Sequence, residues 1–201
     1  MTSHASPAPF RIATFTLSDT RTPDDDVGGK LLGERLVAAG FVIVSHAILR
    51  EEPDTLRETI AFACDADVAD AIVLTGGTGI APRDRTLETL EPMFEKRLDG
   101  FGEAFRRLSW EQIGPRAILS RAAAGVIRGK VVAALPGSPD AVRLAVDALL
   151  APTLAHAIAL ASGRGGAHAH HGHEKHGHDK HAHDKHAHDK HAHDKHGGRK
   201  G

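Results

Sequence analysis

The sequence has a single cysteine, Cys64, among its 201 residues, so the chain cannot form an internal disulfide. A lone thiol is typical of a protein kept in a reducing compartment, and we expect Cys64 to serve as a small buried residue. The first ten residues also lack the basic start and apolar core of a secretory signal. These absences favour a cytoplasmic protein.

Excess charge of either sign is missing too. Lys and Arg number 25 against 26 acidic residues, which leaves a formal net charge of -1. A balanced charge gives no overall attraction to nucleic acid or to membrane surfaces. No stretch approaches the roughly 18 apolar residues that span a bilayer. We therefore expect neither nucleic acid nor a membrane as a partner. If the protein binds an anion, a local group of residues must do so, because the net charge does not attract it.

Apolar runs alternate with amphipathic segments between residues 11 and 162. This alternation predicts an α/β domain of three layers, in which helices cover both faces of a mostly parallel sheet. The expected strands are 11–17, 41–49, 71–75 and 131–135, and the expected helices are 27–40, 53–65, 138–150 and 153–161. The segment 86–130 is harder to interpret. Its parts 86–98 and 100–114 have helical spacing, whereas 116–121 fits either a strand or a loop.

Three polar segments follow expected strands: "SDTR" (18–21), "TGGTG" (75–79) and "PGSP" (136–139). Ligands of open α/β sheets bind beyond the carboxyl ends of the strands, so these segments can converge on one pocket. The glycines allow backbone N–H groups to surround an anion, although a plain turn is the alternative. The spacing matches neither a P-loop nor a dinucleotide fingerprint. The candidate substrate-binding residues are Ser18, Asp19, Thr75, Gly76, Gly77, Thr78, Gly79, Arg83, Gly137, Ser138 and Pro139.

Asp84 follows the glycine segment and lies between Arg83 and Arg85. A carboxylate beside bound phosphates makes sense when Mg²⁺ joins them, since Mg²⁺ is held by one or two carboxylates and substrate phosphates. The alternative is a helix cap or an aspartate paired with arginine. Asp19 has the same two interpretations. Glu51 follows the second expected strand, so it either lies near the same edge of the sheet or is a plain surface acid. Ser138 is the N-cap of the helix that follows it on either interpretation.

The composition changes abruptly after residue 162. Residues 173–197 hold five copies of a five-residue unit with two histidines, one acid and one lysine. Such a segment has no side chains for a core, so we predict that 163–201, like the N-terminal residues 1–10, is disordered. Its imidazoles predict binding of Ni²⁺, Zn²⁺ or Co²⁺, against the alternative of a solvated tail. The candidate ligands are His173, His176, His178, His181, His183, His186, His188, His191, His193 and His196.

Five segments follow one another along the chain: "SDTRTPDDDVGGKLL", "TGGTGIAPRD", "GFGEAFRRLSWEQIG", "ILSRAAAGV" and "ALPGSPDAV". Taken together they resemble the MoaB/MogA family of molybdenum cofactor biosynthesis, and the third and fourth are closer to the MoaB branch. The resemblance implies Mg²⁺-dependent adenylylation of molybdopterin by ATP, with pyrophosphate released. It also implies a catalytic, metal-linked Asp84 beside Glu51, a trimer or hexamer, and contact with other molybdenum cofactor enzymes.

The chain departs from the family pattern at two places. Glu51 stands where the resemblance leads us to expect aspartate, and "DDVGGK" replaces a more usual Thr-Ser-Gly. The longer Glu51 side chain can displace a metal ligand, so a molybdopterin-binding paralogue or carrier with weak catalysis is the main alternative. Relatives with other chemistry, the molybdenum-insertion and competence-damage-like proteins, differ from this chain in the central glycine loop.

Overall fold

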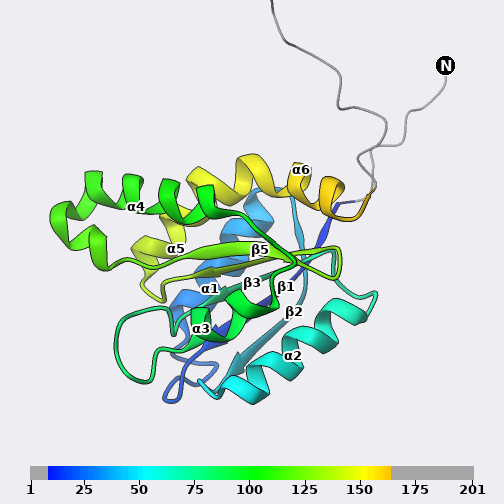
Figure 1. Cartoon of the computed structure of the whole chain (residues 1–201), viewed down its shortest axis with the longest axis horizontal. Coiled ribbons are helices and arrows are strands. Elements are labelled where there is room, and N and C mark those ends of the chain that lie inside the picture. The colour runs from blue at the N-terminus through cyan, green and yellow to red at the C-terminus, as the bar shows by residue number, and fades with distance from the viewer. Residues whose placement is uncertain (1–8, 164–201) are drawn as a thin grey trace, which may run out of the picture. The chain divides into compact units, whose positions relative to one another are not determined.

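A six-stranded sheet lies between two layers of helices in the computed structural model, which describes residues 9–163 (Figure 1). The strand order is β2–β1–β3–β6–β5–β4. The first four strands are mutually parallel, β5 is antiparallel to β6, and β4 is antiparallel to β5. The strands are β1 (Arg11–Leu17), β2 (Val42–Leu49), β3 (Ala71–Thr75), β4 (Lys96–Arg97), β5 (Ala123–Ile127) and β6 (Lys130–Leu135).

The helices divide between the two faces of this sheet. α1, α4, α5 and α6 pack on one face, and α2 and α3 pack on the other. The helices are α1 (Val27–Ala38), α2 (Pro53–Asp65), α3 (Thr86–Leu90), α4 (Asp99–Ile113), α5 (Pro139–Ala145) and α6 (Ala151–Ala161). Two short 3₁₀ helices, Glu91–Met93 and Gly114–Leu119, follow α3 and α4, and a π-helical segment, Val146–Leu150, joins α5 to α6.

The central strand β3 shows why the sequence carries uninterrupted apolar runs. Ala71 and Val73 belong to the core under α1 and α5, whereas Ile72 and Leu74 belong to the core under α2. Side chains alternate between the faces of a strand, so a strand covered on both faces must be apolar throughout. Cys64 of α2 is buried in the second of these cores, as expected, and burial raises the pKa of its thiol to about 11.

The predicted α/β sandwich is confirmed, and the four predicted strands and the early helices lie where the patterns indicated. The segment 86–130 differs from expectation. Residues 86–98 form only a short helix, a 3₁₀ turn and the strand β4, and 116–121 lies mostly in a 3₁₀ helix. The strand β5, whose sequence "AAGVI" is short and rich in small residues, was not predicted.

The two expected C-terminal helices form one continuous helix, Pro139–Ala161, because the π-helical segment carries the backbone through residues 146–150. The expectation that no stretch approaches the length of a membrane span was wrong, because among the described residues this one helix is long and apolar enough to cross a bilayer. It packs on the sheet through a fully buried stripe, so this apolar character serves the core of the fold. The stripe consists of Val142, Ala145, Val146, Leu150, Leu154 and Ile158.

The predicted disorder at the two ends of the chain concerns mainly residues 1–8 and 164–201, which lie outside the described residues. The ten histidines proposed as metal ligands, from His173 to His196, belong to this part of the sequence. Their metal binding and the proposed boundaries at residues 10 and 163 remain predictions.

Candidate functional site

The carboxyl ends of the adjacent parallel strands β1, β3 and β6 meet at one cavity of about 470 Å³, which we name the substrate cavity. This convergence is what the sheet order dictates for three strands that run side by side in one direction. The cavity is lined by Leu17, Ser18, Thr20, Arg21, Glu51, Gly76, Gly77, Thr78, Gly79, Arg83, Asp84, Leu119, Ser120, Arg121, Pro136 and Gly137.

The glycine loop 75–79 turns sharply where β3 ends. Gly76 and Gly77 have φ angles of +100° and +62°, in the region that favours glycine. A Cβ atom on Gly76 would lie 2.3 Å from the carbonyl oxygen of Leu17, so β1 and the loop approach as closely as they do only because this side chain is missing.

Hydrogen bonds from neighbouring elements hold the loop in place. Thr86 at the start of α3 donates its hydroxyl to the carbonyl of Gly76 at 3.1 Å and its backbone N–H to that of Gly77 at 3.0 Å. The N–H of Gly76 is donated to Leu135 of β6. Within the described residues, no acceptor takes the N–H groups of Gly77, Thr78 and Gly79. Backbone donors without an acceptor in consecutive residues of a glycine-rich turn are suited to binding an anion.

Glu51 brings a buried carboxylate to the same cavity. Its side chain is 6% exposed, and its Oε2 atom has no hydrogen-bond partner among the described residues. The nearest cation is Arg83, whose Nη2 lies 3.8 Å from Oε1. Burial raises the pKa of Glu51, the charges of Asp84 and Asp19 raise it further, and Arg83 opposes them. A buried carboxylate with one unpartnered oxygen, beside two other acids, is an arrangement that a further cation would stabilise.

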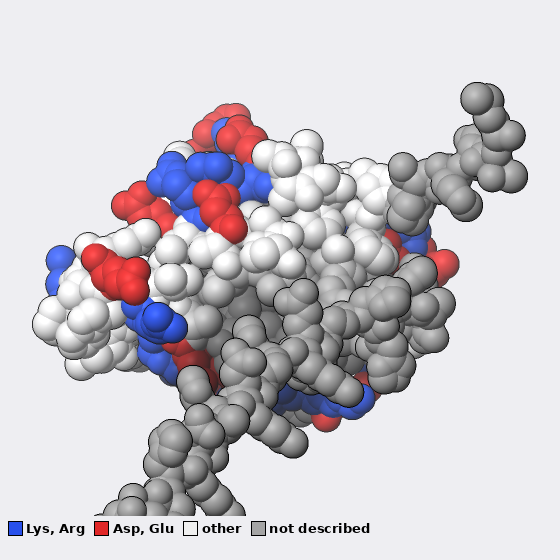
Figure 2. Space-filling view, turned by 90° about the horizontal axis from the view of Figure 1, so that it is seen from above, with Lys and Arg blue, Asp and Glu red and all other residues white. Residues whose placement is uncertain are grey.

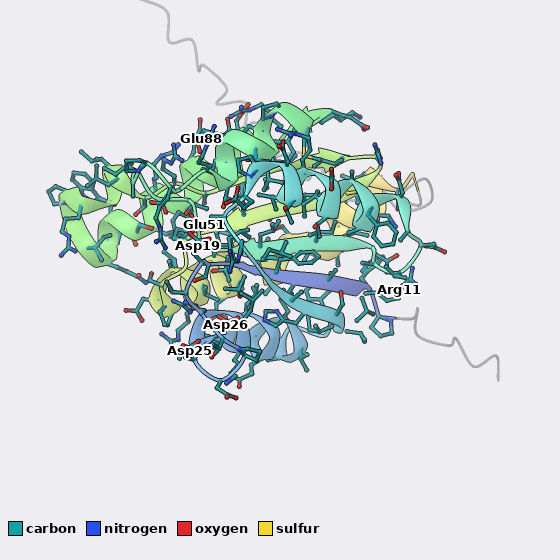
Figure 3. The ribbon with its side chains drawn as sticks, turned by 90° about the horizontal axis from the view of Figure 1, so that it is seen from below. Arg11, Asp19, Asp25, Asp26, Glu51 and Glu88 are labelled. Atoms are coloured by element: carbon teal, nitrogen blue, oxygen red, sulfur yellow. The ribbon has the colours of Figure 1, made fainter. Side chains whose placement is uncertain are left out.

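Asp84 and Asp19 flank Glu51 from two different loops. Asp84 accepts a hydrogen bond from the N–H of Ala81 at 3.0 Å, which fixes the turn that carries it. Asp19 accepts one from the N–H of Glu51 at 3.1 Å, and Figure 3 shows these two residues close together. No group of three His, Cys, Asp or Glu side chains within residues 9–163 forms a ready-made metal site. Glu51 and Asp84 instead fit an ion that takes its remaining ligands from phosphates and water, as Mg²⁺ does.

Most of the residues predicted from sequence reach the substrate cavity, but four do not line it. Thr75 is 1% exposed and donates its hydroxyl to the carbonyl of Pro136. Ser138 caps α5 by accepting the N–H of Ala141, and Pro139 begins that helix. Asp19 lines a neighbouring cavity instead. Ser18 lines the substrate cavity, yet its hydroxyl accepts the N–H groups of Thr20 and Arg21.

Arg121 is a cavity residue that the sequence reasoning did not single out. Its Nε donates to the carbonyl of Thr78 at 2.8 Å, and its two Nη atoms bind both carboxylate oxygens of Glu88. It precedes β5, which runs antiparallel to β6 and so begins at the edge where β6 ends. The segment "ILSRAAAGV", which contains Arg121, contributed to the family resemblance, but the resemblance assigned no role to this arginine.

Comparison with known proteins identifies the family of this chain. A family model described as "Probable molybdopterin binding domain" matches residues 13–156. The molybdenum cofactor biosynthesis protein B of Bacillus subtilis (strain 168) is 46% identical over 158 residues, which is 77% of this chain and 93% of the relative. The chain belongs to the MoaB/MogA family. It lies on the MoaB branch, as the two segments after residue 100 indicated.

Solved MoaB structures have the same fold. A crystal structure of a molybdenum cofactor biosynthesis protein B aligns with a TM-score of 0.75 and 39% identity over 78% of this chain and 98% of that one. The MoaB of Thermus thermophilus, described as a molybdopterin biosynthesis enzyme, aligns with a TM-score of 0.68 and 31% identity over 77% and 97%. The MoaB assignment makes this chain a molybdenum cofactor biosynthesis protein with a molybdopterin-binding domain.

Proposed function

We propose that this chain transfers AMP from Mg²⁺·ATP to the phosphate of molybdopterin and releases pyrophosphate. The observation that carries the proposal is the unpaired Oε2 atom of buried Glu51, which lies beside Asp84 and the free N–H groups of the glycine loop. Both substrates are anions, so this reaction needs positioning and charge neutralisation more than a side-chain nucleophile.

Each part of the cavity has a role in this proposal. The N–H groups of Gly77, Thr78 and Gly79 bind phosphate oxygens and orient them. Arg83, whose side chain is 55% exposed at the cavity rim, neutralises charge that accumulates on the phosphates. Glu51 and Asp84 hold Mg²⁺, which when bound screens the negative charges of the two substrates from each other.

Measurement of pyrophosphate release from ATP, molybdopterin and Mg²⁺ tests this function. We expect turnover by the unmodified protein, loss of at least 100-fold in Asp84→Asn, and retained or increased activity in Glu51→Asp. Arg97→Gln is the matched control, because Arg97 pairs with Glu91 and Asp99 outside the substrate cavity. If the unmodified protein binds molybdopterin without turnover, the enzyme proposal is wrong and the carrier alternative holds.

The chain also has features that favour self-association, and we propose a trimer or a dimer of trimers. Trp110 and Ile113 of α4, with Ile118 and Leu119 of the following 3₁₀ helix, are all about half exposed or more. Figure 2 shows that the described part of the face carrying α4 and α6 is largely uncharged, with charged residues gathered near its margins. Light scattering would show a mass near three or six chains, and a monomer would contradict the proposal.

A second function is proposed for the histidine-rich tail, in which five repeats supply ten histidines between His173 and His196. Neutral imidazoles are good ligands for Ni²⁺, Zn²⁺ and Co²⁺ and poor ones for the oxyanion molybdate, so we assign the tail to divalent metal. We further propose a cytoplasmic location, supported by the single cysteine, and contact with other molybdenum cofactor enzymes.

A further inference from the structure

Arg21 lies between the substrate cavity and a neighbouring cavity of about 530 Å³. The neighbouring cavity is formed by the loop after β1, the start of α1 and the side of β2, and it includes Asp26, Lys30, His46 and Arg50. Among the residues that line both spaces, Arg21 is the only charged one. A cation in this position can reach a ligand bound on the glycine loop.

The carboxylate of Asp26 holds the side chain of Arg21 in place through an ion pair. The Nη1 atom of Arg21 lies 3.3 Å from Oδ1 of Asp26, whose carboxylate is only 2% exposed. The same oxygen accepts the N–H of Gly29 at 2.9 Å and so caps α1. The backbone N–H of Arg21 is donated to Ser18 at 3.2 Å. Both the backbone and the guanidinium of Arg21 are therefore fixed by the fold.

His46 on β2 fixes Asp26 in turn. Its Nε2 lies 3.1 Å from Oδ2 of Asp26, and its Nδ1 lies 2.9 Å from the hydroxyl of Thr14. An ionised carboxylate only accepts hydrogen bonds, so Nε2 donates in the contact with Asp26. Gly29 makes this cluster possible, since a Cβ there would lie 2.2 Å from Oδ2 and 2.6 Å from the His46 ring.

Asp26 keeps its charge in this setting. Burial opposes ionisation, but the nearby hydroxyl of Thr16 and the hydrogen bonds from Gly29 and His46 outweigh burial and lower the pKa of Asp26. A charged, immobile partner leaves the guanidinium in one orientation. Within the described residues, no acceptor takes the Nε and Nη2 donors of Arg21. A planar fork with free donors is suited to a phosphate group, which arginine binds through two parallel hydrogen bonds.

We propose that Arg21 binds a phosphate group of a substrate and that Asp26 is the positioning residue that orients it. The proposal rests on the function above, in which both ATP and molybdopterin bring phosphates to this cavity. Titration of Mg²⁺·ATP alone and of molybdopterin alone, each followed by calorimetry, identifies which of the two supplies the phosphate.

Two substitutions and a control test the proposal. Arg21→Gln removes the charge-assisted hydrogen bonds, so we expect affinity for one of the two ligands to fall roughly 10–100-fold. Asp26→Asn retains an N-cap as good as aspartate but loses the charge that orients Arg21, and we expect a smaller loss, about 3–10-fold. Arg50→Gln removes a cation that lines only the neighbouring cavity and should bind both ligands as the unmodified protein does.

The double variant separates positioning from a structural role. If Asp26 acts through Arg21, Asp26→Asn has no further effect on affinity once Arg21 is Gln. Equal losses from Asp26→Asn in both backgrounds, or unchanged affinity for both ligands in Arg21→Gln, would overturn the inference. Binding without pyrophosphate release by the unmodified protein would instead contradict the proposed reaction and leave the role of Arg21 intact. Failure of the unmodified protein to bind either ligand overturns both proposals.

Discussion

Arg121 and Glu88 form a bidentate ion pair, with Nη1–Oε1 and Nη2–Oε2 distances of 2.7 and 3.0 Å. The third nitrogen of the guanidinium, Nε, donates to the carbonyl of Thr78 at 2.8 Å. One side chain thus ties the glycine loop to α3. Thr86 holds the carbonyl of Gly77 and Arg121 holds that of Thr78, so Arg121 contributes to how rigidly the N–H groups of the loop are presented.

Arg121→Lys should loosen the loop without unfolding the domain. Lysine keeps the charge but cannot bind Glu88 and Thr78 through one planar group. We expect faster amide hydrogen exchange at residues 77–79 and a roughly 10-fold lower kcat/KM, with little change in melting temperature. Arg97→Lys alters a comparable surface pair remote from the loop and is the control. Unchanged exchange at 77–79 would show that other contacts hold the loop.

Gly76→Ala should destabilise the protein by about 2 kcal/mol or more, because alanine is strained at a φ of +100° and its Cβ would meet the Leu17 carbonyl. Gly33 offers the opposite case. It lies within α1 with nothing within 4 Å of an added Cβ, so Gly33→Ala should stabilise by about 0.5–1 kcal/mol. Urea unfolding measures both values. A neutral Gly76→Ala would contradict the tight approach of the loop to β1.

Glu51→Gln should be inactive yet more stable than the unmodified protein at pH 7. The pKa of Glu51 is raised by burial and by its acidic neighbours, so the folded state resists ionisation. Stability is therefore lost as the pH rises from the ordinary value near 4.5 through the raised folded pKa. Glutamine cannot ionise, which removes this loss.

Thermal unfolding measured from pH 3 to 8 tests whether the stability of the unmodified protein falls relative to Glu51→Gln as the pH rises. The melting temperatures of the two proteins should agree most closely at low pH, and Glu51→Gln should be higher by about 2–4 °C at neutral pH. Saturating Mg²⁺ and ATP should raise the melting temperature of the unmodified protein only. A Glu51→Gln variant that is less stable at pH 7 would mean that the charge of Glu51 is satisfied in the folded protein.

Deletion of residues 168–196 should abolish tight binding of Ni²⁺ and Zn²⁺ and leave adenylylation unchanged, because every residue of the substrate cavity lies before residue 138. Calorimetry on the full chain and on the shortened chain measures the difference. A full-length variant with the ten repeat histidines replaced by glutamine keeps the tail length and is the matched control. Equal metal uptake by all three proteins would contradict a role for the tail histidines.

The position of the glycine loop, Asp84 and Glu51 at one cavity could be predicted, because parallel strands that lie side by side end at the same edge of the sheet. The sequence could not show that Glu51 is buried with an unpaired oxygen, since burial depends on how Gly77 and the loop between β2 and α2 pack together. The pattern also could not separate Ser138, which caps a helix, from residues that line the cavity. Ser138 and the residues that line the cavity all follow strands, and only the folded structure shows which of them reach the cavity.

The strand β5 was missed for a related reason. "AAGVI" is short and holds small residues, and its Gly125 is needed because a Cβ there would lie 2.4 Å from Phe94. Small residues in this position carry little strand propensity, so only tertiary packing selects the extended conformation. Unless β5 is recognised, the sequence gives no reason to place Arg121 beside Thr78. The side of the substrate cavity that Arg121 lines was therefore not predicted.

The reversed direction of β5 has a consequence for how this fold can diversify. Leu119, Ser120 and Arg121 enter the cavity from the start of a strand, whereas the glycine loop and Glu51 enter after the ends of strands. A change in the length or sequence of the preceding 3₁₀ segment can therefore reshape one side of the pocket while the phosphate-facing side stays in register. Related proteins can acquire new ligand preferences through changes in this segment, while the parallel sheet keeps its structure.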